Sequence, residues 1–170
     1  MWLIGGAILS RRTLFPIMGQ EDYMADRTAQ ATWKGTLTEG SGTINSVGSG
    51  AISNLGVTWK ARTESSDGMT SPEELIAAAH AACYAMAFSN VLAKAGHPAD
   101  QLNVTAVCSF EPKPEGGWKI SKMRLDVEGR VPGVDNAEFK RLAQEGEAGC
   151  PVSAALRNNV DIQLNAHLAA

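Results

Sequence analysis

The sequence predicts a single α+β domain, in which strand-like segments flank one long apolar helix. Short β-like runs fill residues 28–62, a helix start stands at Ser71, and alternating apolar patterns return after Gly96. A chain of 170 residues that is 44% hydrophobic has the size for one compact domain with a core. We expect residues 27–170 to form this domain and residues 1–26 to form a poorly packed N-terminal extension.

Composition argues against several classes of partner. The net charge of −3, from 18 acidic and 15 basic residues, has no excess that would attract nucleic acid or an anionic membrane. The apolar run 1–9 precedes a basic pair, which is the wrong order for a secretory signal, and it is shorter than the roughly 20 apolar residues of a membrane helix. Three cysteines without zinc-type spacing favour a reducing cytoplasm and no metal. These cysteines are Cys83, Cys108 and Cys150.

The segment before the long helix predicts a meander of about three strands. Residues 29–33 and 57–61 are β-like, and the residues between them are rich in the Gly, Ser and Thr typical of turns. We expect Trp33, Trp59 and Trp118, which all lie in strand-like segments, to be packing residues.

A capping box predicts the start of the central helix. In the sequence Ser-Pro-Glu-Glu at 71–74, Ser71 caps, the proline takes the first helical position, and the second glutamate stands at the third. The helix should end at Gly96. Between residues 75 and 88 the only strongly polar side chain is His80. A helix that is apolar on all sides must be covered on all sides, so we place it at the centre of the fold and not in a membrane.

The second half predicts a hairpin, two short helices and a final strand. Apolar residues alternate over 104–110 and again over 123–127, with a Pro- and Gly-rich turn between the two runs. A second capping box opens a helix over 135–148. A helical turn over 153–157 and an alternating strand over 160–164 complete the domain.

Local rules do not make Cys83 reactive. It lies about 12 residues into the helix, beyond the first turn in which the helix dipole acts. Burial among apolar neighbours would raise its pKa above the free value of about 8.5. Taken alone, both Cys83 and Cys108 would be inert core residues.

Cys150 has a different local setting. Pro151 stands at the first position of a new helical turn, which puts the Cys150 thiol near an N-cap where free N–H groups favour a thiolate. The alternative is a cysteine that only closes a tight Gly-Cys-Pro corner. By local rules Cys150 is the more acidic of the two thiols.

Four short motifs resemble the OsmC branch of the OsmC/Ohr family of organic hydroperoxide reductases. They are Ser-Pro-Glu-Glu-Leu at 71–75, Ala-Ala-His-Ala-Ala-Cys at 78–83, Val-Pro-Gly at 131–133 and Gly-Cys-Pro-Val-Ser at 149–153. The resemblance covers roughly residues 28–164. It implies an OsmC-like fold, with antiparallel sheets wrapped around long central helices in an intertwined homodimer.

The resemblance also implies the site and its reaction. Cys83 matches the peroxidatic cysteine, Cys150 the resolving cysteine, Arg62 the arginine that holds the thiolate, and Glu73 the glutamate that pairs with this arginine. The implied reaction reduces organic hydroperoxides, and hydrogen peroxide less efficiently, through a Cys83 sulfenic acid and a Cys83–Cys150 disulfide. An external dithiol of the dihydrolipoyl type then restores the thiols, and no metal, flavin or haem is required.

Physical chemistry fits this assignment. A cation must replace the solvation that burial removes from a mid-helix thiolate, and the planar fork of Arg62 can serve the sulfur and a peroxide oxygen together. Ten helical residues separate Glu73 from Cys83 and rise about 15 Å. We therefore expect the Arg62 and Glu73 that serve one Cys83 to come from a second subunit.

The surroundings of the helix bear on specificity and on the role of His80. We expect the apolar residues along the helix to favour organic over hydrogen peroxide; these include Leu75, Met86 and Phe88. His80, three residues before Cys83, could modulate the thiol, but a hydrogen-bonded core histidine is the favoured interpretation.

Two alternatives remain open. In a cysteine hydrolase, Cys83 would be the nucleophile and His80 or another histidine the base. In a non-enzymatic binding module, the apolar helix would line a ligand pocket and the cysteines would be structural.

Overall fold

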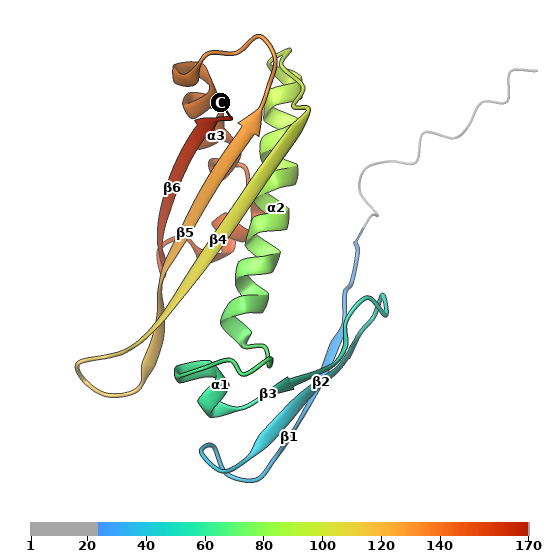
Figure 1. Ribbon diagram of the computed structural model, residues 1–170, viewed down its shortest axis with the longest axis vertical. Coiled ribbons are helices and arrows are strands. Elements are labelled where there is room, and N and C mark those ends of the chain that lie inside the picture. Colours follow the sequence, from blue (N-terminus) through green and yellow to red (C-terminus); the bar gives the residue numbers. More distant parts are fainter. Residues whose placement is uncertain (1–23, 170) are drawn as a thin grey trace, which may run out of the picture.

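A computed structural model describes residues 24–169 and shows two three-stranded sheets with one long helix, α2 (Figure 1). The predicted α+β class is confirmed. The elements are, in chain order, β1 (Ala29–Lys34), β2 (Ser41–Val47), β3 (Ser53–Val57), α1 (Trp59–Thr63), α2 (Pro72–Lys94), β4 (Gln101–Pro112), β5 (Trp118–Arg130), α3 (Asn136–Ala148), α4 (Pro151–Leu156) and β6 (Asp161–Leu168). All but the last three residues of the predicted extension 1–26 lie outside the described part of the chain.

The first sheet is the predicted antiparallel meander, in the order β1-β2-β3. The expectation of a strand over 57–61 is wrong beyond Val57, because the chain turns there into the short helix α1. Thr58 caps this helix, and its hydroxyl accepts a hydrogen bond from the Ala61 backbone N–H at 3.0 Å. The turn of α1 places Arg62 beside the start of α2.

Helix α2 starts as predicted. The Ser71 hydroxyl accepts from the Glu74 N–H at 3.1 Å, and Pro72 follows at the first helical position. The Glu74 carboxylate accepts from the Thr70 hydroxyl, so it does not close the reciprocal half of the capping box. At the other end Gly96 adopts a positive φ of 85°, which ends the helix.

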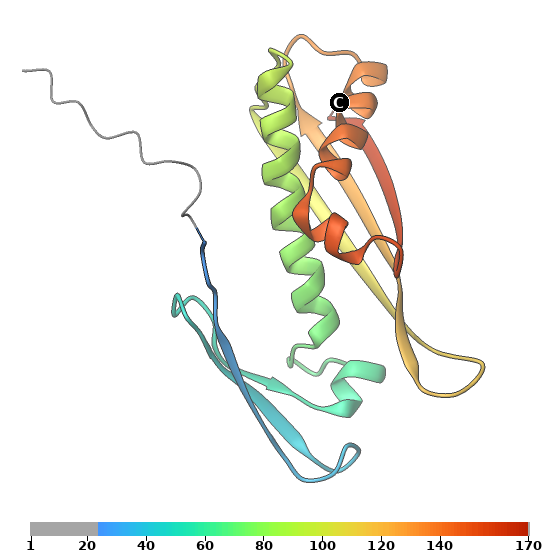
Figure 2. The same ribbon diagram turned by 180° about the vertical axis from the view of Figure 1, so that it is seen from behind.

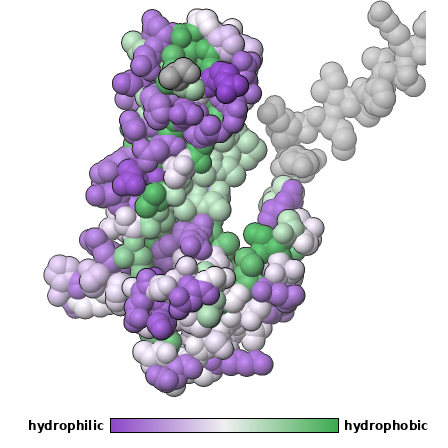
Figure 3. All heavy atoms as spheres, viewed as in Figure 1, coloured by the Kyte–Doolittle hydropathy of each residue, from purple (hydrophilic) through white to green (hydrophobic). Residues whose placement is uncertain are grey.

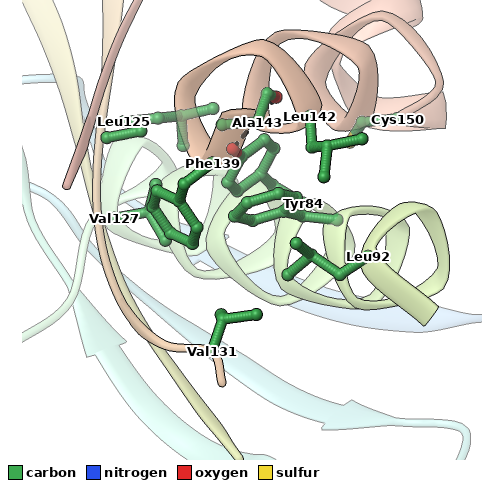
Figure 4. Packing of buried hydrophobic residues seen from close by; sticks show 11 residues of the cluster. Tyr84, Leu92, Leu125, Val127, Val131, Phe139, Leu142, Ala143 and Cys150 are labelled. Carbon is green, nitrogen blue, oxygen red and sulfur yellow. Dashed lines mark hydrogen bonds between the residues drawn. The ribbon is translucent and has the colours of Figure 1, made fainter. Parts of the chain in front are cut away.

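One stripe of α2 faces the core. Its buried side chains recur every four residues, at His80, Tyr84, Phe88 and Leu92, which places them on one face. Figure 4 shows Tyr84 and Leu92 packed against Phe139 and Leu142 of α3. The core therefore lies between α2, α3 and the second sheet.

The opposite face of α2 is uncovered within the chain. Met86 is 69% exposed, and Ala78, Ala79 and Ala82 are exposed beside it. In Figure 3 hydrophobic residues colour this face of the helix green. The expectation that α2 is covered on all sides is thus wrong for a single chain, because the second sheet and α3 pack on one side only. In length and apolar composition α2 is also the one described helix that could cross a membrane.

The second sheet contains one connection that differs from the prediction. Strands β4 and β5 form the expected antiparallel hairpin, in which Cys108 lies opposite Met123. The expectation of antiparallel pairing throughout is wrong for β6, which runs parallel to β5. Parallel neighbours need a crossover, and α3 with α4 provides it. Figure 2 shows α3 and α4 lying along α2, while the first sheet stands apart at the N-terminal end of that helix.

We expect Gly146→Ala to destabilise the protein, although alanine normally favours a helix. A Cβ on Gly146 of α3 would lie 2.9 Å from Phe88 Cα of α2, so the two helices would have to separate. The gain in helix propensity of about 1 kcal/mol would be outweighed by overpacking of about 1–3 kcal/mol. Urea denaturation measures the balance, with the exposed Gln144→Ala as control. A higher midpoint for Gly146→Ala would contradict the close packing of α2 and α3.

Candidate functional site

The fold brings together two cysteines that are 67 residues apart in the sequence. Cys150 Sγ lies 3.2 Å from Cys83 Sγ, within hydrogen-bond distance for two thiols. Cys150 is fully buried and Cys83 is half-buried. A disulfide needs about 2.05 Å between sulfurs, so a shift of about 1 Å would allow the bond to form.

A tight corner positions Cys150. Helix α3 ends at Gly149, whose N–H donates to the Glu145 carbonyl, and α4 begins at Pro151. Proline lacks an N–H and suits a first helical position, so the chain starts a new helix at once. Cys150 becomes the N-cap of α4, as the local pattern predicted, and faces the middle of α2.

The environment of Cys83 within the chain disfavours its thiolate. Burial raises the pKa of the Cys83 thiol above its ordinary value, and the nearby Cys150 thiol raises that pKa further. The backbone N–H of Val152, in the first turn of α4, donates to the Cys83 sulfur and lowers the pKa in part. An additional positive charge is needed to make Cys83 a thiolate at neutral pH.

Arg62 and Glu73 form a bidentate ion pair at the start of α2. Arg62 Nη2 lies 2.6 Å from Glu73 Oε1, and Arg62 Nε donates to both carboxylate oxygens. Glu73 is only 6% exposed, and the guanidinium carbon of Arg62 lies 4.1 Å from the centre of the Phe110 ring. The predicted contact between the two residues is therefore present.

The four predicted site residues therefore form two groups within one chain. One group is the sulfur pair, and the other is the Arg62–Glu73 pair, ten residues of helix before Cys83. That interval rises about 15 Å, which is too long for an arginine bound to Glu73 to reach Cys83 in the same chain.

Two clefts share Arg62. A polar cleft of about 520 Å³ is lined by Arg62, Glu73 and Cys108, among others. A second cleft, of about 340 Å³, is largely apolar. Its lining includes Trp33, Leu37, Val57, Trp59, Arg62 and Pro72.

The residues expected to make the site apolar do not line these two clefts. Phe88 is fully buried in the core, Met86 projects from the uncovered face of α2, and Leu75 faces a separate cleft beneath the first sheet. The neighbours of Arg62 are instead Trp59 and Phe110. Sequence reasoning missed Phe110 and assigned Trp59 to packing alone, because nothing local links either residue to Arg62.

Cys108 is not the deeply buried residue that strand alternation suggested. It is half-buried on the wall of the polar cleft that contains Glu73. Burial raises the pKa of the Cys108 thiol, and the Glu73 charge raises it further. Cys108 is therefore a poor nucleophile in this setting.

His80 is the hydrogen-bonded core histidine that the sequence favoured. Its ring is fully buried, and Nε2 lies 2.8 Å from the hydroxyl oxygen of Ser153. Burial lowers the pKa of His80, against an opposing effect of the Glu147 charge, so the ring is neutral at pH 7. Sequence reasoning missed Ser153, although its place three residues after Cys150 mirrors that of His80 three residues before Cys83.

Comparison with known proteins identifies the family. Residues 65–165 match the family described as OsmC-like protein. The chain belongs to the OsmC family. It is 39% identical to "Peroxiredoxin OsmC" of Escherichia coli K12 over 136 residues, which cover 80% of this chain and 93% of that relative. The "Organic hydroperoxide resistance protein" of Xanthomonas axonopodis pv. citri is 35% identical over 97 residues, covering 56% of this chain and 65% of that protein.

Solved structures of the same family share the fold. The organic hydroperoxide resistance protein OhrB of Bacillus subtilis superposes with a TM-score of 0.64 at 26% identity, covering 82% of this chain and 97% of that one. The OsmC protein of Legionella pneumophila superposes with a TM-score of 0.61, also at 26% identity, covering 82% and 96%. The predicted OsmC-like fold is confirmed.

We expect mild oxidation to join Cys83 to Cys150 and to leave Cys108 free, because only the first two sulfurs are in contact. One equivalent of diamide followed by alkylation and peptide mapping checks the pairing. A mixed population that includes Cys108 disulfides would contradict this geometry. Cys108→Ser is the matched control and should form the same disulfide at the same rate.

Proposed function

We propose that this OsmC-family protein is a cysteine-based peroxidase that reduces organic hydroperoxides to alcohols. The observation that carries the proposal is the 3.2 Å contact between the Cys83 and Cys150 sulfurs at the junction of two helices. The names of its relatives, a peroxiredoxin and organic hydroperoxide resistance proteins, support the same activity.

The cycle needs only the chemistry of sulfur. The Cys83 thiolate attacks the terminal peroxide oxygen, the O–O bond breaks, and the alkoxide takes a proton to leave as the alcohol. Cys83 is now a sulfenic acid, which condenses with the Cys150 thiol to give a disulfide and water. An external dithiol, which we propose to be of the dihydrolipoyl type, reduces the disulfide by exchange. A reducing cytoplasm suits this last step.

Cys83 is proposed as the attacking thiol because it is the more accessible one. It is half-buried, whereas Cys150 is fully buried behind it. A peroxide can therefore meet the Cys83 sulfur first, and Cys150 then reaches it from within the protein. The greater accessibility of Cys83 argues against Cys150 as the attacking thiol, although its position at a helix N-cap made Cys150 the more acidic thiol by local rules.

The apolar cleft beside Arg62 supports an organic substrate. Its tryptophan, leucine, valine and proline side chains would bury a hydrocarbon tail, while the guanidinium at its edge binds oxygen. Hydrogen peroxide has no tail to bury and gains nothing from this cleft. We therefore propose that organic hydroperoxides are preferred.

We further propose that the working site is shared between two subunits. In one chain Arg62 is bound to Glu73 at the start of α2 and makes no hydrogen bond to Cys83. The uncovered apolar face of α2 needs a covering surface. A homodimer that buries this face and brings the partner's arginine to Cys83 meets both needs, since an opposite charge within about 4–6 Å lowers a pKa by about 1–3 units.

Substitution of each cysteine should separate the two halves of the cycle. Cys83→Ser should abolish turnover of cumene hydroperoxide, because no thiolate remains to attack it. Cys150→Ser should allow one turnover and leave a sulfenic acid that dimedone traps on Cys83. Peroxide consumption and intact-mass spectrometry measure both results, with Cys108→Ser as the active control. If Cys150→Ser does not react with the hydroperoxide and Cys83→Ser still does, the two roles are reversed.

Mixed dimers should test the shared site. Arg62→Ala and Cys83→Ser should each be inactive alone, since each homodimer lacks one component in both sites. Unfolding and refolding them together should restore about a quarter of the wild-type activity, because half of the dimers then contain one complete site. Peroxide turnover is the measurement. A mixture as inactive as its components would place all four residues in one subunit.

The two alternatives to a peroxidase, a cysteine hydrolase and a non-enzymatic binding module, require different properties of the site. A cysteine hydrolase needs a base on its nucleophile, but His80 Nε2 is bound to the Ser153 hydroxyl. A binding module would leave both thiols unmodified after one equivalent of hydroperoxide. Loss of two hydrogens, mapped to Cys83 and Cys150, would exclude it.

A further inference from the structure

A buried polar pair lies beside the two sulfurs and has no part in the cycle above. His80 and Ser153 are both fully buried, and 2.8 Å separates His80 Nε2 from Ser153 Oγ. The other ring nitrogen, Nδ1, is buried without a hydrogen-bond partner among the described residues. Natural proteins leave few buried polar atoms unpaired, so a buried histidine with one unpaired ring nitrogen calls for a physical reason.

The pair joins the same two helices as the sulfurs. His80 lies three residues before Cys83 on α2, and Ser153 lies three residues after Cys150 on α4. Residues three apart on a helix are neighbours on its surface. The hydrogen bond and the sulfur contact are therefore two adjacent links between α2 and the start of α4.

Within helix α4, Val152 packs against the core and Ser153 makes the one polar side-chain contact in the described part of the chain. The helix contains six residues, and Ser153 is the only one of them that is buried. Its N-cap residue, Cys150, makes no side-chain capping bond. The Val152 contact and the Arg157–Glu147 ion pair at the C-cap also hold α4. Together with them, the Ser153 hydroxyl bond restrains rotation of α4 about its axis, and with it the direction of the Cys150 sulfur. The bond forms with either ring tautomer, since a serine hydroxyl can donate or accept.

We propose that His80 and Ser153 are positioning residues that align Cys150 for disulfide closure; this inference rests on the proposed function. In that step the Cys150 thiolate attacks the Cys83 sulfur, an S–S bond forms, and the S–O bond of the sulfenic acid breaks. The leaving hydroxide takes up the proton that Cys150 lost and becomes water. Attack along the S–O axis tolerates little misplacement of the Cys150 sulfur. The His80–Ser153 hydrogen bond therefore affects the rate of disulfide formation and not the rate at which Cys83 attacks the peroxide.

A single-turnover experiment separates the two steps. All variants carry Cys108→Ser, so that only Cys83 and Cys150 remain as thiols. Reduced protein is mixed with one equivalent of cumene hydroperoxide and quenched with dimedone at intervals. The dimedone adduct reports the sulfenic acid, and the loss of two hydrogens reports the disulfide. We expect Ser153→Ala to form sulfenic acid at the parent rate and to close on the order of 10- to 100-fold more slowly.

Two substitutions of His80 test whether the bond itself matters. In His80→Gln the amide reaches about as far as Nε2 and can still meet the Ser153 hydroxyl, whereas in His80→Asn it reaches only about as far as Nδ1. We expect Gln to retain rapid closure and Asn to close as slowly as Ser153→Ala. Ser89→Ala, on the exposed side of α2, is the control and should change neither step.

Three results would overturn the positioning role of His80 and Ser153. Closure at the parent rate in Ser153→Ala, or equal closure in the Gln and Asn variants, overturns the proposal. Equal slowing of both steps together with a lower melting temperature also overturns it, because the pair would then be merely structural. If Ser153→Ala does not fold, the Gln and Asn comparison decides.

The same experiment distinguishes failure of the peroxidase assignment from failure of the positioning role of His80 and Ser153. If peroxide does not oxidise Cys83 in the parent protein, the peroxidase assignment is wrong. Diamide then supplies the oxidation, and the rate at which the Cys83–Cys150 disulfide closes in the same variants still tests the positioning role.

Discussion

The contact between the start of α4 and the middle of α2 is the constraint on which the site depends. Two sulfurs can form a disulfide only when they can approach to about 2 Å, and here they lie 3.2 Å apart on segments 67 residues apart in the sequence. The crossover through α3 and α4, which the parallel strand β6 requires, carries Cys150 back to α2. Close packing at Gly146 and the corner at Pro151 then bring the sulfur into place.

Burial makes this contact possible and works against its chemistry. The same apolar surroundings that hold Cys83 beside Cys150 raise the pKa of Cys83. One chain opposes this effect with a single backbone N–H from Val152, while its arginine stays bound to Glu73 at the start of the helix. A chain with a half-built site and an uncovered apolar helix face fits the proposal that a second copy supplies the missing charge.

Much of the fold could be predicted from local signals. Ser71 and Asp135 both cap the helices assigned to them, and the hairpin of β4 and β5 follows the alternation of its apolar residues. Predictions failed where distant parts of the chain decide the outcome. Strand β6 pairs in parallel, and only one stripe of α2 is covered. One local signal was also missed, the Thr58 cap that begins a helix at Trp59. For the site, the family resemblance indicated both cysteines, Arg62 and Glu73, but it gave no role to Phe110 or Ser153.

The sequence by itself determined most of the elements and indicated the side chains that we propose to carry the chemistry, because caps, periodicity and short motifs act within a few residues. Only the tertiary structure decided the distances: that Cys83 touches Cys150, that Arg62 does not reach Cys83 in its own chain, and that His80 faces Ser153. The reason is physical. Each of these contacts joins segments whose approach depends on how whole helices pack against one another, and no local pattern contains that information.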